Sequence, residues 1–211
     1  MSTGNGNNID LGTLGGSASA AYSVNDNGQI VGNADFGWWS VGHATLFDIT
    51  GSGNNIDLGT LEGDRSCALS INNNGQIVGY SANILGNCHA TLFDPTGNGN
   101  NIDLGTLGGS ASAAYGINDS GQIVGYAFGT TFNSHATLFD ITGNGNNIDL
   151  NTLIDPTSGW TLYCARSINN NGWIVGEGMN PDGDMHAYLL TPEPATIFLL
   201  GLVSLLLRKK Q

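Results

Sequence analysis

The sequence predicts an all-β fold: a β-propeller-like array of four-stranded antiparallel units, followed by a short C-terminal apolar helix. Three phrases recur four times in a fixed order, and each copy holds four short segments typical of strands. Repeats with a period near 46 residues are typical of propellers and related repeat architectures. An abrupt change of composition after Leu190 separates this body from the C-terminal segment.

The phrase Asn-Asn-Ile-Asp-Leu anchors the repeat. Its isoleucines are spaced by 46 or 47 residues and are Ile9, Ile56, Ile102 and Ile148. The second phrase has the form Ile/Val-Asn-x-x-Gly-x-Ile-Val-Gly, and the third is His-Ala, beginning at His43, His89, His135 and His186. We therefore assign residues 1–190 to one repeat domain and residues 191–211 to a separate segment.

The first full copy illustrates the strands that we expect, at residues 20–24, 29–32, 43–47 and 55–58. Each range alternates or holds a short β-branched run, and Gly and Asn bound it. Residues 25–28, Asn-Asp-Asn-Gly, predict a type I turn closed by a glycine in the left-handed region. One such sheet cannot bury both faces, so neighbouring copies are expected to stack as in a propeller. An open β array or solenoid is the alternative.

The order of the strands leaves two interpretations open. The chain starts within a fourth strand, at residues 8–11, and its last copy ends after a third strand, at residues 186–190. In a closed ring of four units, residues 8–11 complete the last sheet and remove an exposed edge. In the other interpretation the four copies are one stretch of a longer array. Residues 1–5 show neither the basic nor the apolar region of a secretory signal.

Charge excludes nucleic acid as a partner of the body. Arg65 and Arg166 are its only basic residues, against 17 acidic residues in the whole chain. Binding to nucleic acid or to anionic lipid requires a basic face, which this body cannot build. The chain has three cysteines, Cys67, Cys88 and Cys164. A disulfide framework needs a larger and even number, so we expect free thiols.

The repeated histidines and aspartates are expected to have a structural role rather than to form a metal or catalytic site. Each histidine occurs once per copy, so the four point to different units, whereas zinc needs ligands that converge on one point. We expect each ring to bond a neighbouring backbone group. Asp48, Asp94 and Asp140 follow a predicted strand, where aspartate suits a turn. No carboxylate pair stands out for catalysis, so the sequence predicts no catalytic residue, no metal site and no cofactor.

Specific contacts are expected where the copies differ. Trp38 and Trp39 lie in one variable connection, and they are candidates for stacking on a sugar, with packing against a neighbouring unit as the other interpretation. Residues 180–184, Asn-Pro-Asp-Gly-Asp, faintly resemble a calcium loop but fit a solvated turn better.

The C-terminal segment has three elements in order. Pro192-Glu193-Pro194 precedes a run of 13 largely apolar residues, 195–207, and Arg208, Lys209 and Lys210 follow directly. As a helix the run is about 20 Å long, short of a ~30 Å hydrocarbon core, with its basic end on the cytoplasmic side. These elements resemble the PEP-CTERM sorting signal of Gram-negative bacteria that produce exopolysaccharide. The resemblance implies transient anchoring in the inner membrane and cleavage by an exosortase-type membrane protease.

The body resembles the HAF family of extracellular repeats. The resemblance rests on His-Ala, on Asp-Leu-Gly-Thr-Leu-Gly-Gly at 103–109 and on the Ile-Val-Gly phrase; the family's phenylalanine after His-Ala is Thr45, Thr91 or Thr137 here. It implies a location in the cell envelope or outside the cell, with exopolysaccharide as a candidate partner. We therefore expect a non-enzymatic surface or matrix protein. The alternatives are a carbohydrate- or ligand-binding module that uses the variable loops and, less favoured, a polysaccharide-processing enzyme.

Overall fold

The computed structural model describes residues 8–37, 41–131 and 133–192. These residues form four antiparallel sheets and one short 3-10 turn, η2 (Leu150–Thr152), which confirms the prediction of an all-β fold. No helix in this part of the chain is long and apolar enough to cross a bilayer. The apolar helix expected at residues 195–207 lies outside the described residues.

Each sheet is built from consecutive strands, each paired with the next. The first sheet contains β1 (Gly15–Val24), β2 (Ile30–Phe36), β3 (Gly42–Phe47) and β4 (Ile56–Asp57). The second contains β5 (Glu62–Ile71), β6 (Ile77–Asn83), β7 (Cys88–Phe93) and β8 (Ile102–Gly105). The third contains β9 (Gly108–Ile117), β10 (Ile123–Gly129), β11 (Ser134–Phe139) and β12 (Ile148–Asp149). The fourth contains β13 (Thr161–Ile168), β14 (Ile174–Met179) and β15 (Met185–Leu190).

The fourth sheet has only three strands among the described residues. Residues 8–11, expected as a fourth strand, belong to none of the sheets. They lie beside the first sheet, where Asn55 Nδ2 donates to the Leu11 carbonyl oxygen at 2.7 Å. The closed-ring interpretation required this segment beside β15, and the structure does not place it there.

A glycine in each second strand permits close pairing with the first strand. The pairing of β1 with β2 shifts register between Ala21 and Ser23, directly opposite Gly32. A methyl group on Gly32 would lie 1.9 Å from the Ala20 carbonyl oxygen, and Gly79, Gly125 and Gly176 have the same relation to their first strands. The third residue of Ile-Val-Gly must therefore be glycine.

The turns between first and second strands have the predicted geometry. Gly28 has φ of 77°, and its N–H donates to the Asn25 carbonyl oxygen at 3.0 Å. The corresponding glycines, Gly75, Gly121 and Gly172, also have positive φ. Each of these four turns thus contains a glycine in the left-handed conformation, which would be strained for a residue with a side chain.

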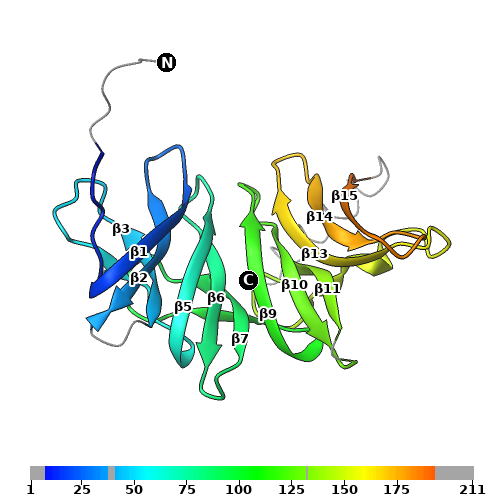
Figure 1. Cartoon of the computed structure of the whole chain (residues 1–211), viewed down its shortest axis with the longest axis horizontal. Coiled ribbons are helices and arrows are strands. Elements are labelled where there is room, and N and C mark those ends of the chain that lie inside the picture. The colour runs from blue at the N-terminus through cyan, green and yellow to red at the C-terminus, as the bar shows by residue number, and fades with distance from the viewer. Residues whose placement is uncertain (1–7, 38–40, 132, 193–211) are drawn as a thin grey trace, which may run out of the picture.

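The core lies between the sheets. In Figure 1 the sheets stand side by side in chain order, with β1–β3 at one end of the long axis and β13–β15 at the other. The first strand of each later sheet packs against the second and third strands of the sheet before it. Three equivalent apolar clusters result, one at each contact between neighbouring sheets.

Candidate functional site

One groove of about 320 Å³ is lined by all four sheets. Each sheet contributes the end of its first strand and the start of the following turn: an apolar residue, an asparagine, and then an asparagine or aspartate. These residues are 24–26, 71–73, 117–119 and 168–170. Because the repeat places equivalent turns at equivalent positions, the groove brings similar residues of all four copies close together.

A ladder of buried asparagines joins the sheets along this groove. Asn25 Nδ2 donates to the Asn72 carbonyl oxygen at 3.0 Å, Asn72 to that of Asn118 at 2.9 Å, and Asn118 to that of Asn169 at 3.0 Å. Each side-chain oxygen also organises its own turn: Asn25 Oδ1 accepts from the N–H groups of Asn27 and Gln29. Asn169 makes the equivalent turn contacts, but no hydrogen bond from its amide to another sheet occurs within the described residues.

A second ladder of exposed residues runs beside the first. The N–H of Asp26 donates to Asn73 Oδ1, that of Asn73 to Asp119 Oδ1, and that of Asp119 to Asn170 Oδ1, each at 2.9 Å. Asparagine and aspartate alternate along this ladder, so carboxylates meet amides. The backbone N–H of Asn73 and the side-chain amide of Asn170 lower the pKa of Asp119. The groove therefore presents a fixed negative charge at neutral pH.

The aspartates with resolved pKa shifts lack the raised pKa that is typical of a general acid. Glycoside hydrolysis uses one carboxylic acid whose pKa is raised so that it stays protonated. Every resolved shift of an aspartate in the described part of the chain is downward. In Asp94, for example, the hydroxyl and N–H of Thr96 lower the pKa to about 2. The aspartates with resolved shifts are thus ionised at neutral pH.

Backbone groups of Asp64 and Ser110, in the neighbouring sheets, hydrogen-bond with His43 and His89, as expected. The histidines of the first three sheets also pair with aspartates, which we did not expect. Their Nδ1 atoms lie 2.5 to 3.0 Å from carboxylate oxygens of the fourth strand or its end, in the pairs His43–Asp57, His89–Asp103 and His135–Asp149. The sequence carried a signal for this pairing, because histidine and aspartate are 14 residues apart in each copy. His186 has no fourth strand beside it and pairs with no carboxylate in the described residues.

Two of these pairs affect the ionisation of both partners. The hydrogen bond that His43 donates to Asp57 raises the pKa of His43, and the one that His89 donates to Asp103 raises the pKa of His89, although burial opposes both shifts. Burial by itself raises the pKa of Asp57, but hydrogen bonds from His43 and the Gly59 N–H outweigh it, and the pKa is lowered. His43 and His89 therefore link the third and fourth strands of their sheets in a pH-dependent way.

The turns expected at three aspartates and at Asn180 are confirmed. Asp48, Asp94 and Asp140 each accept the N–H two residues on and so form turns. Asn180 Oδ1 accepts from the N–H groups of Asp182 and Asp184, as a solvated turn predicts. Within the described ranges no three metal-binding side chains come close enough to share an ion.

The cysteines are free, as expected, and Cys67 and Cys164 are buried. Burial raises the pKa of each of these two thiols to about 11, so both stay protonated at neutral pH. Trp38 and Trp39, the candidate sugar contacts, and the sorting elements from Glu193 to Lys210 lie outside the described residues.

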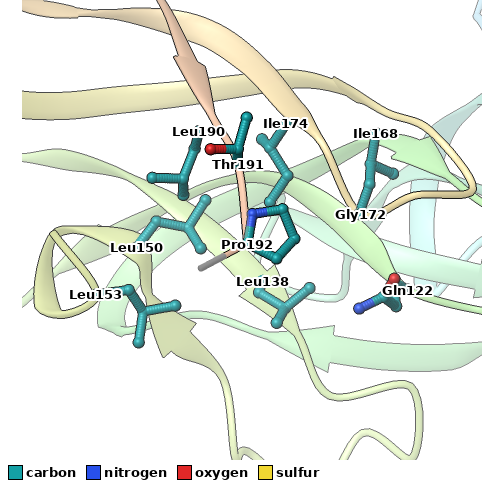
Figure 2. A pocket seen from close by; sticks show the side chains of 10 residues that line it. All are labelled: Gln122, Leu138, Leu150, Leu153, Ile168, Gly172, Ile174, Leu190, Thr191 and Pro192. Carbon is teal, nitrogen blue, oxygen red and sulfur yellow. The ribbon is translucent and has the colours of Figure 1, made fainter. Parts of the chain in front are cut away.

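Pro192, the first residue of Pro-Glu-Pro, does lie within the described structure. It lines a small apolar pocket of about 70 Å³ between the third and fourth sheets, together with Leu138, Leu150, Ile168 and Ile174 (Figure 2). A methyl group on Gly172 would lie 3.2 Å from the proline ring, so the packing is close. The β body and the expected sorting segment therefore meet at this residue.

Comparison with protein-family models, with curated proteins and with solved structures finds no match to this chain.

Proposed function

We propose that this chain is an exported, non-enzymatic protein of the bacterial cell surface or extracellular matrix. The observation that carries the proposal is the tail, in which Pro192-Glu193-Pro194, an apolar run and Arg208-Lys209-Lys210 follow directly on a β repeat body. In this proposal the tail is a PEP-CTERM sorting signal that an exosortase-type protease cleaves at the inner membrane. The released body then joins the exopolysaccharide layer.

The chemistry of the body supports a scaffold role. Three of its four histidines bind aspartates of the same sheet, its buried asparagines bind the next sheet, and two of its cysteines are buried as protonated thiols. Histidine, aspartate and cysteine are side chains that catalysis often uses, and these contacts instead join parts of the fold. We further propose that the four sheets are the blades of a propeller-like array, since their equivalent turns line one groove.

The sorting proposal is tested by deleting residues 193–211 from the full chain in an exosortase-containing host. Keeping Pro192 leaves the lining of the pocket between the third and fourth sheets intact. We expect the full chain to reach the envelope or the medium and the deletion variant to lose that destination. An equal unfolding midpoint of the two proteins shows that sorting, and not folding, was lost. Unchanged localisation of the deletion variant contradicts the proposal.

A second candidate function, carbohydrate binding, is favoured by the groove. Concave sites with a few fixed polar groups are typical ligand sites, and here all four sheets contribute carboxylates or amides. A glycan array compares the wild-type chain with Asp26→Ala and with the Trp38→Ala/Trp39→Ala variant. Binding lost only with Asp26 assigns the groove, and binding lost only with the tryptophans assigns their loop. No binding to any glycan by the wild type contradicts this function.

A further inference from the structure

Each contact between neighbouring sheets joins two different faces. The trailing face of a sheet is formed by a valine of the second strand, an alanine of the third and a leucine at the end of the fourth: Val31, Ala44 and Leu58 in the first sheet. The leading face of the next sheet is formed by an alanine and an isoleucine of its first strand: Ala68 and Ile71 in the second sheet. The chain uses this pairing three times.

Both faces occur once more, and there the described residues supply no partner. On the fourth sheet Val175 is 44% exposed, whereas the equivalent Val31, Val78 and Val124 are 0% exposed. On the first sheet Val24 is 63% exposed, whereas the equivalent Ile71, Ile117 and Ile168 are at most 8% exposed. The described part of the chain therefore leaves a trailing face exposed on the fourth sheet and a leading face exposed on the first. These two sheets lie at opposite ends of the long axis (Figure 1).

The segment before the first sheet already occupies the place of a preceding sheet's fourth strand. A methyl group on Gly51 would lie 2.7 Å from the Asp10 carbonyl oxygen. The same relation links Gly97 to the Asp57 carbonyl at 2.8 Å, and Gly143 to the Asp103 carbonyl at 2.7 Å. Residues 9–11 are therefore positioned as a fourth strand, and none of the described residues forms a third strand beside it.

The unmatched polar groups at the two ends are also complementary. On the fourth sheet, three groups have no partner among the described residues. β15 pairs with no fourth strand, His186 pairs with no carboxylate, and the Asn169 amide has no acceptor on another sheet. At the other end, residues 9–11 supply a strand, Asp10 a carboxylate and Asn25 a carbonyl group. Each of these pairings already exists elsewhere in the chain.

We propose that a second copy of this chain docks head to tail, with its leading face on the trailing face of the fourth sheet. Residues 9–11 of the second copy then pair with β15 of the first, and Asp10 meets His186 as Asp57 meets His43. Asn169 donates to the Asn25 carbonyl oxygen of the second copy. A second copy is the occupant because it supplies the same residues, in the same positions, that cover these faces within the chain. Such a contact is heterologous, so copies close into a ring or extend as a filament.

The test measures mass in solution by sedimentation equilibrium on the full chain in mild detergent. Wild type is expected to contain two or more copies per particle. Val24→Arg and Val175→Arg each break one face at an exposed position, and each variant alone is expected to be monomeric. A 1:1 mixture of the two is expected to form a dimer and nothing larger, because one intact leading face meets one intact trailing face. Ile84→Arg, at a loop residue that is 75% exposed and belongs to neither face, is the matched control and is expected to behave as wild type.

The outcomes separate the proposal from its rivals. Monomeric wild type at about 100 μM overturns it, and so does a mixture of the two variants that stays monomeric. Association that survives both substitutions assigns assembly to another surface, such as the tail, and overturns it as well. Val24→Thr and Val175→Thr keep the β-branched shape and serve as the second pair if either arginine variant lowers the unfolding midpoint. The experiment does not depend on export, so its result is independent of the proposed function.

Discussion

At the scale of single residues, one asparagine in each of the first three sheets performs two tasks. Its side-chain oxygen closes the turn between first and second strands, and its amide nitrogen crosses to the next sheet. A buried amide that loses its acceptor costs about 1–3 kcal/mol. The ladder thus makes the position of each sheet depend on a correctly formed turn in its neighbour.

Asn72→Asp separates the two tasks, because aspartate keeps the turn-closing oxygen and lacks the donor. We expect the free energy of unfolding to fall by about 1–3 kcal/mol, since a carboxylate then faces the Asn118 carbonyl oxygen. Both changes are made in the Val24→Arg variant, which should be monomeric. Asn169→Asp is then the matched control, because that amide reaches no further sheet among the described residues, and it should change stability by less than about 0.5 kcal/mol. Urea denaturation measures both. Equal losses at the two positions would mean that the ladder does not hold the sheets.

The histidine–aspartate pairs predict a pH dependence of stability. The pKa of His43 and His89 is raised in the folded state, so their contribution is complete below the ordinary value of about 6.5 and is lost as pH rises through the raised pKa. The pKa of Asp57 and Asp103 is lowered, so their contribution is complete above about 4 and is lost as pH falls through the lowered pKa. The pairs therefore stabilise the fold most between about pH 4 and pH 6.5.

Raising the pH from 5.5 to 8.5 should lower the free energy of unfolding by up to about 1 kcal/mol for each of these partly exposed pairs, and the urea midpoint should fall with it. The Asp57→Asn/Asp103→Asn variant should show a flatter pH profile. Asp182→Asn, at an exposed turn residue away from the histidines, should keep the wild-type profile. A wild-type midpoint that rises over this range would show that the pairs do not govern the pH response.

At the scale of elements, the glycine of Ile-Val-Gly sets how the first two strands meet. Gly79→Ala would place a methyl group 1.9 Å from the Cys67 carbonyl oxygen, which the backbone can relieve only by moving apart. We expect a loss of about 2–4 kcal/mol in the free energy of unfolding. Gly129→Ala, in the equivalent strand of the third sheet, meets nothing closer than 4.0 Å and should be nearly neutral. If both variants unfold at the same denaturant concentration, the close approach is not a constraint.

The sequence predicted which elements exist better than it predicted how they meet. The turn at 25–28 was predictable because its chemistry is local, and Gly28 has the expected conformation. The extension of β1 back to Gly15 was not, since Gly15 pairs with Phe36 across a register shift. The contact of His43 with Asp57 was missed for the same reason: cross-strand partners depend on register, which no single segment reveals.

At the scale of the whole molecule, stability is distributed as in a linear array. Each apolar cluster joins only neighbouring sheets, so the second and third sheets bury both faces while the first and fourth bury one each. In such an array stability is approximately the sum of the contributions of units and of nearest-neighbour interfaces. The end sheets should therefore open at lower free energy than the middle ones.

Hydrogen exchange tests this gradient. In the Val24→Arg variant, which should be monomeric, amides of β14 are expected to exchange at least tenfold faster than equivalent amides of β6 and β10, since Val175 is exposed where Val78 and Val124 are buried. In wild type at assembling concentrations the difference should shrink, because a second copy covers the trailing face of the fourth sheet. Uniform protection in the variant would show that the four sheets open as one unit. A gradient that persists unchanged in wild type would show that the trailing face stays uncovered.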